Sequence, residues 1–270
     1  MSTATAETTW RADVDADGRI DAAVVQSYRD DGFVRIRGVF DPDEIAHFRT
    51  AAQSYLDANR SESLGAGMPA RAAIFTQLVN VWRNDPAMAE LTLHPRVAGI
   101  AEQLTDRPMR IWHDHMLVKE PRSNRATQFH QDRPYWPHDP ASGPSLSAWI
   151  ALVDVPAERG CMSFLPGTQQ LTGFRPQNLD DEEDLFRVDP ELRWSRRITL
   201  PLKAGDLTFH SSYTGHMAMP NTTDEARIAH VNIYMDADTA YVEQPHVVTD
   251  PLGLPGGARL DGELFPRPLG

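Results

Sequence analysis

The spacing of apolar residues changes at Met109, and this change constrains the fold more than any other feature of the sequence. Before Met109 the apolar residues recur with the period of amphipathic helices. From Met109 almost to Asp238 they alternate with polar residues in short runs separated by turn residues, as strands do. Helices followed by many short strands predict an α+β protein that is mainly β, with a sandwich or barrel at its centre.

The helical part contains clear end signals. Gly32 is placed to close a first helix, and Asp41, Pro42 and Glu44 supply an N-cap, a first-turn proline and a capping-box acid for a second. The expected helices cover Asp21–Asp31, a segment that begins at Asp41, Ile74–Arg83 and Arg96–Leu104. The expected strands are Phe33–Ile36, Arg110–Lys119, Thr127–Gln131, Leu146–Val155, Ser163–Leu165, Arg197–Pro201, Asp206–His210 and Ile228–Met235.

A chain of 270 residues with this pattern is expected to form one domain. We expect residues 1–18 to be a flexible arm, 19–108 to be helical, 109–238 to form the β core and 239–270, rich in Pro and Gly, to wrap the surface. The acidic stretch Leu171–Arg196 has the composition of a surface insertion. The helices should pack on the outside of the β core.

Charge and cysteine content narrow the function. The formal net charge of −12 disfavours a nucleic-acid partner. The longest apolar runs have the length of strands, so no membrane span is expected, and Met1–Trp10 lacks the basic and apolar regions of an export signal. Cys161 is the single cysteine, which excludes an internal disulfide and a thiolate metal cluster, and we expect it to play a small apolar role. These features favour the cytoplasm; they do not indicate an oligomeric state.

Three residues form a candidate metal site. His130 and Asp132 lie two positions apart in an extended segment, where alternate side chains share one face, so they can bind one ion together. His216, in a later segment, is the candidate third ligand. Two neutral nitrogens and one carboxylate form a facial triad, which leaves coordination positions open for a co-substrate and dioxygen.

Other histidines keep alternatives open. An H-x-D pair alone usually means a satisfied polar pair near a turn. His210 has the same parity as His216 on an extended segment and is an alternative ligand or a buried hydrogen-bonding residue. His113 and His115 with His216 would suit a three-histidine cupin site, although one core and one pocket residue is the commoner outcome of such a pair.

Arg227 follows His216 after a turn, and its guanidinium can hold a carboxylate through two parallel hydrogen bonds. This is what the far carboxylate of 2-oxoglutarate would require. The alternative is a surface ion pair between Arg227 and Asp224 or Glu225.

Taken in order, these motifs resemble the phytanoyl-CoA dioxygenase-like branch of the iron(II)/2-oxoglutarate oxygenases, from about Asp30 to Met235. The matching segments are Asp31–Val34, Met116–Lys119, His130-Gln131-Asp132, Trp149–Leu152, Gly160–Thr168, Gly205-Asp206, His216–Thr222 and Arg227. The resemblance implies a double-stranded β-helix, also called a jelly roll or cupin-like fold. It also implies iron(II) bound by the facial triad, 2-oxoglutarate and dioxygen as co-substrates, and Arg227 and Trp149 at the 2-oxoglutarate site.

The chain departs from this family at Ala218, where many members carry a serine that helps to hold 2-oxoglutarate. Thr127, Gln128 or Asn232 is expected to substitute for it. Because related halogenases replace the metal carboxylate with a small residue, Asp132 favours hydroxylation or another oxidation over halogenation.

The substrate is expected to be a small molecule, with secondary metabolism as one candidate source, and its identity and site of oxidation are not indicated by the sequence. Candidate substrate-binding residues are Arg133, Tyr135, Trp136 and His115, with His138 in the same loop. The leading hypothesis is a hydroxylase that releases succinate and carbon dioxide. Its competitors are a cupin-type metal enzyme that does not use 2-oxoglutarate and a catalytically silent jelly-roll binding protein.

Overall fold

The fold of the chain is known from a computed structural model that describes residues 11–15, 17–64, 75–177 and 184–269. Its helices are α1 (Ala22–Asp31), α2 (Pro42–Asn59), α3 (Pro86–Thr92), α4 (Pro95–Thr105) and α5 (Leu185–Val188). Its strands are β1 (Arg11–Asp13), β2 (Phe33–Arg37), β3 (Thr76–Val79), β4 (Met109–Lys119), β5 (Thr127–His130), β6 (Ser145–Ala151), β7 (Met162–Phe164), β8 (Ile198–Leu200), β9 (Leu207–Ser211), β10 (His216–Ala218) and β11 (Arg227–Asp236).

The strands form two sheets. The larger has the order β1-β2-β9-β6-β11-β4-β3, and the smaller has the order β5-β10-β7-β8. All residues of β6 and β11 are buried, because helices cover one face of the large sheet and the small sheet faces the other. This is the two-sheet jelly roll with external helices that the sequence predicts.

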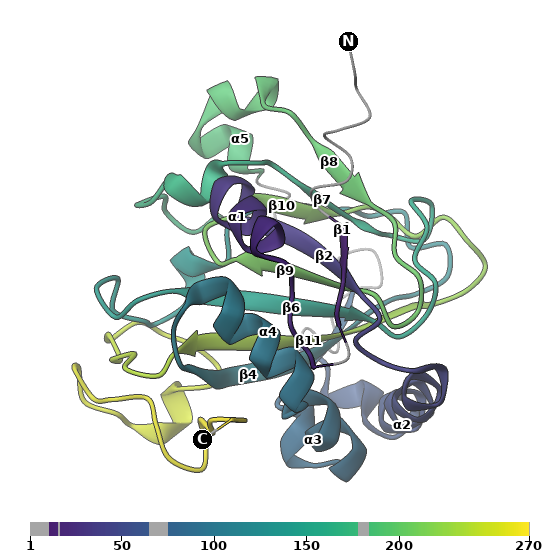
Figure 1. Cartoon of the computed structure of the whole chain (residues 1–270), viewed down its shortest axis with the longest axis horizontal. Helices are drawn as coiled ribbons and strands as arrows, with labels where there is room; N and C mark the ends of the chain where they lie inside the picture. Colours follow the sequence, from purple (N-terminus) through teal and green to yellow (C-terminus); the bar gives the residue numbers. More distant parts are fainter. Residues whose placement is uncertain (1–10, 16, 65–74, 178–183, 270) are drawn as a thin grey trace.

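The two faces of the large sheet serve two cores. On the outer face, Ala148 and Ile150 of β6 pack in the same cluster as helical residues such as Ile100 of α4. On the inner face, Trp149 of β6 and Val231 of β11 pack toward the small sheet. Figure 1 shows α1 and α4 lying across the strands of the large sheet, and α5 near β8. Because alternate residues of a strand point to opposite faces, the inner face also carries the polar side chains of the site.

Most of the predicted helices are confirmed. Asp21 caps α1 by accepting a hydrogen bond from the Ala23 amide, and Gly32 ends it at φ 84°. The capping box of α2 is present, with the Asp41 side chain bound to the Glu44 amide and the Glu44 side chain bound to the Asp41 amide. Among the described residues, no helix is both long and apolar enough to cross a membrane.

The helix predicted over Ile74–Arg83 is wrong. Thr76–Val79 is strand β3, which pairs with β4 at the edge of the large sheet, and a 3-10 turn covers Val81–Arg83. Ile74 lies outside the described residues. Pairing with β4 decides the outcome, since a segment of four residues has no strong helical preference of its own.

Two other segments differ from expectation. In the predicted arm, residues 1–10 lie outside the description, but Arg11–Asp13 forms β1 and pairs in parallel with β2. The predicted surface insertion contains α5, and its Leu185 is buried with Phe129 of β5. The C-terminal segment lies beside β4 (Figure 1), and its Phe265 stacks on Trp112 in the inner core.

Candidate active site

The three predicted metal ligands meet through a strand pair and a turn. His130 ends β5 and His216 begins β10, and the two residues are direct partners in the antiparallel register. Asp132 lies just after β5 in right-handed helical conformation, where it precedes the 3-10 turn Arg133–Tyr135. His130 and Asp132 were expected to share one face of a strand, and this expectation is wrong. Instead, a turn directs the carboxylate of Asp132 toward both imidazoles.

The ligand atoms of these residues converge on one point. Nε2 of His130 and Nε2 of His216 each lie 3.6 Å from Oδ1 of Asp132. All three ligand atoms lie within 4.8 Å of one another. Two nitrogens and one carboxylate oxygen at these separations match the facial triad of non-haem iron(II) sites.

Hydrogen bonds fix the imidazoles in the tautomer that a metal requires. Nδ1 of His130 lies 2.7 Å from the carbonyl oxygen of Gln128, and Nδ1 of His216 lies 2.9 Å from that of Thr214. Each Nδ1 therefore carries the hydrogen, and each Nε2 presents its lone pair. Burial, followed by the proximity of His130, holds the pKa of His216 well below its usual value, so this ligand is neutral.

Asp132 is held as an anion by its surroundings. Burial raises its pKa, but His216 and the contacts with His130 and His210 outweigh that effect and place it well below the usual value. Its second oxygen, Oδ2, accepts a hydrogen bond of 3.2 Å from Oγ of Ser147 and lies 3.6 Å from Nε2 of His210. His210 thus faces the oxygen that is not shared by His130 and His216, as a buried polar partner of the ligand.

Arg227 lines the same cavity as His130, Asp132 and His216. Its side chain is buried with the guanidinium carbon 5.3 Å above the ring of Trp149, and Nη1 donates to the carbonyl oxygen of Leu117 at 3.1 Å. Nε has no hydrogen-bond partner among the described residues. Burial lowers the pKa of Arg227 to about 9, which leaves it charged at neutral pH. A buried cation with an unused donor has the charge and the hydrogen-bonding capacity that an anion requires.

The alternative partners proposed for Arg227 are engaged elsewhere. Asp224 forms a two-pronged pair with Arg122, and Glu225 lies 2.8 Å from Arg159. Both acids are exposed, whereas Arg227 is fully buried. A surface ion pair therefore does not explain Arg227.

Comparison with known proteins agrees with this geometry. Residues 28–229 match the phytanoyl-CoA dioxygenase (PhyH) family, which covers well over half of the chain. The chain belongs to this family. Phytanoyl-CoA dioxygenase domain-containing protein 1 of Mus musculus is 24% identical over 57% of the chain and 54% of its own length. The chain thus spans about half the length of this curated relative.

Two solved structures resemble this PhyH-family chain over nearly all of its length. One is the non-heme alpha ketoglutarate dependent carbocyclase SnoK from nogalamycin biosynthesis, 37% identical with a TM-score of 0.83 over 94% of this chain and 98% of that one. The other is the epimerase SnoN in complex with Fe3+, alpha ketoglutarate and nogalamycin RO, 35% identical with a TM-score of 0.78 over 91% and 99% of the two chains. The predicted jelly roll and the predicted cofactors, iron, 2-oxoglutarate (alpha ketoglutarate) and dioxygen, are confirmed by these comparisons.

The structure distinguishes among the residues expected to replace the family's serine at Ala218. Thr127 is the direct strand partner of Ala218, and both line the cavity with Arg227. Gln128 is not among the described lining residues, and its carbonyl oxygen instead binds His130. Asn232 points to the outer face, where its amide donates to the carbonyl oxygens of two residues at the end of α3, Leu91 and Thr92. Thr127 is therefore the side chain placed to act beside Arg227.

The expected substrate residues divide in the same way. Tyr135, Trp136 and His115 line the cavity. Arg133 does not appear in the described lining; it is buried, donates weakly to the carbonyl oxygen of Trp136 and lies over the ring of Tyr213. His138 packs against Trp112 behind the cavity wall. We therefore assign neither Arg133 nor His138 to the cavity.

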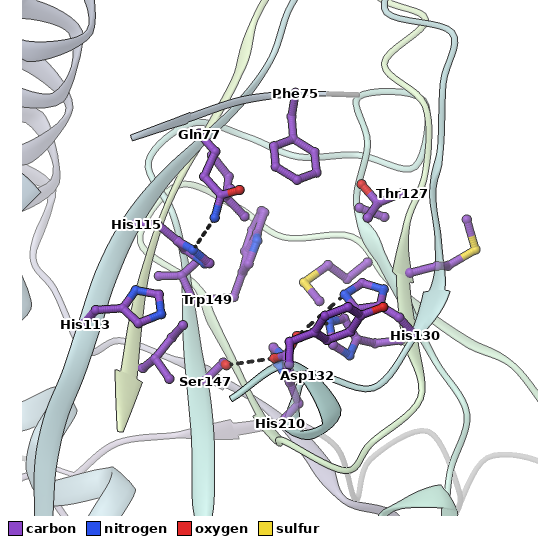
Figure 2. Close-up of a pocket in the computed structure, with 18 of the residues that line it drawn as sticks. Phe75, Gln77, His113, His115, Thr127, His130, Asp132, Ser147, Trp149 and His210 are labelled. Atoms are coloured by element: carbon purple, nitrogen blue, oxygen red, sulfur yellow. Dashed lines mark hydrogen bonds and ion pairs between the residues drawn. The ribbon is translucent and has the colours of Figure 1, made fainter. Parts of the chain in front are cut away.

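The three-histidine alternative does not fit the geometry. His113 and His115 lie on β4, across the cavity from His130 and Asp132 (Figure 2), and they do not belong to the group that can hold a metal among the described residues.

Sequence reasoning missed two residues of the site. Ser147 shares the β6 face with Trp149, so strand alternation could have indicated it, whereas nothing in the sequence marks His246 of the C-terminal segment.

Proposed function

We propose that this protein oxidises a C–H bond of a small molecule with iron(II), 2-oxoglutarate and dioxygen, releases succinate and carbon dioxide, and hydroxylates its substrate. The proposal rests on one observation. Arg227, which is buried and whose Nε has no hydrogen-bond partner among the described residues, lines the same cavity as the convergent residues His130, Asp132 and His216. The whole cavity, of about 290 Å³, has the size of a small-molecule site, and 2-oxoglutarate and a small organic substrate would share it.

Each part of the site has a definite task. His130, Asp132 and His216 would hold iron(II), which together with 2-oxoglutarate and dioxygen supplies an oxidant strong enough for an unactivated C–H bond. Ser147 and His210 hold the second carboxylate oxygen of Asp132 and so fix the direction of the first.

The 2-oxoglutarate site follows from the neighbouring side chains. The guanidinium of Arg227 would bind the far carboxylate, with Trp149 packed against the guanidinium face and the hydroxyl of Thr127 as a further donor. Because Arg227 is buried, the carboxylate it binds is shielded from water, which strengthens the pair.

Tyr135, Trp136 and His115 are proposed to contact the substrate, since they line the cavity that the metal ligands enter. A cytoplasmic location remains part of the proposal and rests on the composition and on the single, buried Cys161.

A second outcome of the same chemistry is supported by the solved structures. SnoK is described as a carbocyclase and SnoN as an epimerase. The sequences of both are more than one third identical to this chain. Removal of a hydrogen atom is common to hydroxylation, ring closure and epimerisation, and the position of the substrate decides which follows. Ring closure or epimerisation is therefore the alternative to hydroxylation in this cavity.

The experiment is to incubate the protein with iron(II), ascorbate, 2-oxoglutarate and candidate substrates and to measure succinate. We expect iron-dependent succinate release that a true substrate stimulates. Mass spectrometry of the product then separates a gain of one oxygen atom (hydroxylation), a loss of two hydrogen atoms (ring closure) and an unchanged composition (epimerisation). An iron-loaded protein that forms no succinate with or without substrates would instead be a silent binding protein or a metal enzyme that uses no 2-oxoglutarate.

A further inference from the structure

The cavity wall opposite the metal centre is built around three histidines, His113, His115 and His246. His113 and His115 lie on the inner face of β4, and His246 comes from the C-terminal segment. The ring centroids of His113 and His115 are 5.3 Å apart, and those of His113 and His246 are 5.6 Å apart. Figure 2 shows His113 and His115 facing the cavity from the side opposite His130. We call these three residues the histidine wall.

The histidine wall is uncharged. Burial is the main cause that lowers the pKa of His115 and of His246 to about 4, and it places the pKa of His113 well below the usual value. Among the described residues that line the cavity, only Asp132 and Arg227 carry a fixed charge, and both belong to the metal and 2-oxoglutarate sites. A charged substrate group would therefore find no ion-pair partner at this wall.

Hydrogen bonds determine which nitrogen of His113 carries the hydrogen. Nδ1 of His113 lies 3.2 Å from the carbonyl oxygen of Asp114, which can only accept, so Nδ1 is the donor. Nε2 of His113 is therefore a lone-pair acceptor. It is buried, the residue is 4% exposed, and no partner for Nε2 is found in the described part of the chain. A buried acceptor without a partner is costly unless a ligand supplies a donor.

The other two histidines have the opposite tautomer. Nδ1 of His246 accepts a hydrogen bond of 3.2 Å from the amide of Val248. Nδ1 of His115 lies 2.9 Å from the side-chain amide nitrogen of Gln77, which donates to it (Figure 2). In both residues Nε2 therefore carries the hydrogen and is a donor.

One acceptor beside two donors complements a hydroxyl group, which donates one hydrogen bond and accepts others. A carbonyl oxygen would leave His113 unsatisfied, and a carboxylate would lack a cation. Aromatic side chains of Phe75, Tyr135 and Trp136 also line the cavity and favour a ring-bearing molecule.

We propose that the histidine wall binds a hydroxyl group of an uncharged hydroxyaromatic substrate and thereby positions its reacting C–H bond toward the metal ligands. This proposal rests on the proposed function for its orientation, but the recognition of the hydroxyl group can be tested without turnover. His113 is the specificity-determining acceptor, and His115 and His246 are the donors.

The test uses 2-naphthol, its methyl ether 2-methoxynaphthalene and the anion 2-naphthoate. Binding to zinc-loaded protein with 2-oxoglutarate is measured by tryptophan fluorescence, since zinc supports no turnover. We expect wild type to bind 2-naphthol about tenfold more tightly than the ether, because the ether leaves His113 without a donor, and to bind 2-naphthoate still more weakly. Equal affinity for the phenol and its ether, or no binding of 2-naphthol, would overturn the proposal.

Variants test whether the preference for 2-naphthol over its methyl ether arises at the histidine wall. His113→Phe and, on a different segment, His246→Phe should each lose most of the preference for the phenol over the ether. His138→Gln is the matched control, because His138 is a buried histidine that packs against Trp112 and does not line the cavity. It should keep the full preference. If His113→Phe is not folded by circular dichroism, His246→Phe decides alone, and an unchanged preference there would contradict the proposal.

Two readouts separate this proposal from the proposed function. Nitrogen-15 NMR of the histidine rings in the zinc protein should show His113 protonated at Nδ1 and His115 and His246 protonated at Nε2; protonation of His113 at Nε2 would refute the assignment. Slow succinate formation without substrate should be equal in wild type and in the control His138→Gln, whose side chain lies outside the cavity. Absence of succinate from the iron-loaded wild type would refute the proposed function and leave the binding result to decide the histidine wall.

Discussion

Two walls of one cavity are built from histidines, yet they differ in what they can bind. At the metal wall, His130 and His216 point their Nε2 atoms at the carboxylate of Asp132, 3.6 Å from each. Asp132 is the only carboxylate among the described residues that line the cavity, and it lies across the cavity from His113 and His115 (Figure 2). The residue type is the same, and the neighbouring acid makes the difference.

Backbone hydrogen bonds reinforce this difference. On the metal wall both Nδ1 atoms face carbonyl oxygens, so both Nε2 lone pairs are directed at one point, as a cation requires. On the histidine wall, Nδ1 of His113 faces a carbonyl oxygen, whereas Nδ1 of His246 accepts from an amide. The wall therefore presents a mixture of one acceptor and two donors. Such a mixture suits a hydroxyl group and cannot coordinate a metal ion.

The most direct way to break the comparison is to remove the acid. Asp132→Ala leaves the metal wall with imidazoles alone and should lower iron affinity and iron-dependent succinate formation by more than about a hundredfold, since even supporting residues of metal sites contribute ten- to a hundredfold. Iron content after dialysis and succinate release are the measurements. His130→Ala and His216→Ala should behave alike, with the fold intact by circular dichroism.

A variant of the opposite wall is the control for that loss. His113→Gln should bind iron as wild type does, because His113 is not part of the group that can hold a metal. Iron loss in His113→Gln as large as in Asp132→Ala would remove the distinction between the walls.

The second prediction concerns the other fixed charge of the cavity. Arg227→Ala should weaken 2-oxoglutarate binding by at least about thirtyfold, since truncating one partner of a buried charge pair costs about 2–5 kcal/mol. Arg227→Lys keeps the charge without the two-pronged geometry and should give an intermediate defect. The apparent KM for 2-oxoglutarate is the measurement, with iron affinity unchanged. A normal KM in Arg227→Ala would show that the carboxylate is bound elsewhere.

The sequence indicated which residues could form the site, but not how they meet. His130 and Asp132 were predicted from their spacing, and the resemblance to the family selected His216 over His210 and Arg227 over a surface ion pair; the structure brings all four to one cavity. The turn at Asp132 was not foreseen, since a two-residue spacing indicates only a shared strand face. Features that depend on contacts between residues far apart in the sequence were also not predicted.

Strand β3 is one example, because its pairing with β4 and not its own composition makes it a strand. The histidine wall is another. His246 is brought to His113 only when the C-terminal segment packs beside β4, and the tautomers depend on partners that lie on other segments or on the backbone. Such information is three-dimensional and is absent from a single sequence.

A third prediction sharpens the role of the acid itself. Ser147→Ala removes the hydrogen bond to Oδ2 of Asp132 and should weaken iron binding by about tenfold, the lower end for a residue that orients a metal ligand. Competition with an iron chelator measures it. Ser145 is the matched control on the same strand face: it binds Ser212 instead of Asp132, so Ser145→Ala should leave iron affinity unchanged. Equal effects of the two changes would deny Ser147 its specific role.

The smallest expected effect concerns the pair Thr127 and Ala218. Thr127→Val keeps the shape but removes the hydroxyl group, and should raise the KM for 2-oxoglutarate about three- to tenfold, the value of one hydrogen bond to a charged group. Ala218→Ser restores the residue that many family members carry and should lower the KM or leave it unchanged, and it should rescue Thr127→Val. If Thr127→Val has a normal KM, Thr127 does not replace the missing serine.

The central claim, that iron(II) bound by His130, Asp132 and His216 and 2-oxoglutarate bound by Arg227 share one cavity, is tested most directly by an anaerobic titration. Addition of 2-oxoglutarate to the iron(II) protein should produce a saturable visible charge-transfer band, since chelation of iron by the 2-oxo acid gives rise to it. Arg227→Ala should reach the same band only at much higher concentration, and His216→Ala should not show it. No band in the iron-loaded wild type, or equal saturation in wild type and Arg227→Ala, would contradict the claim.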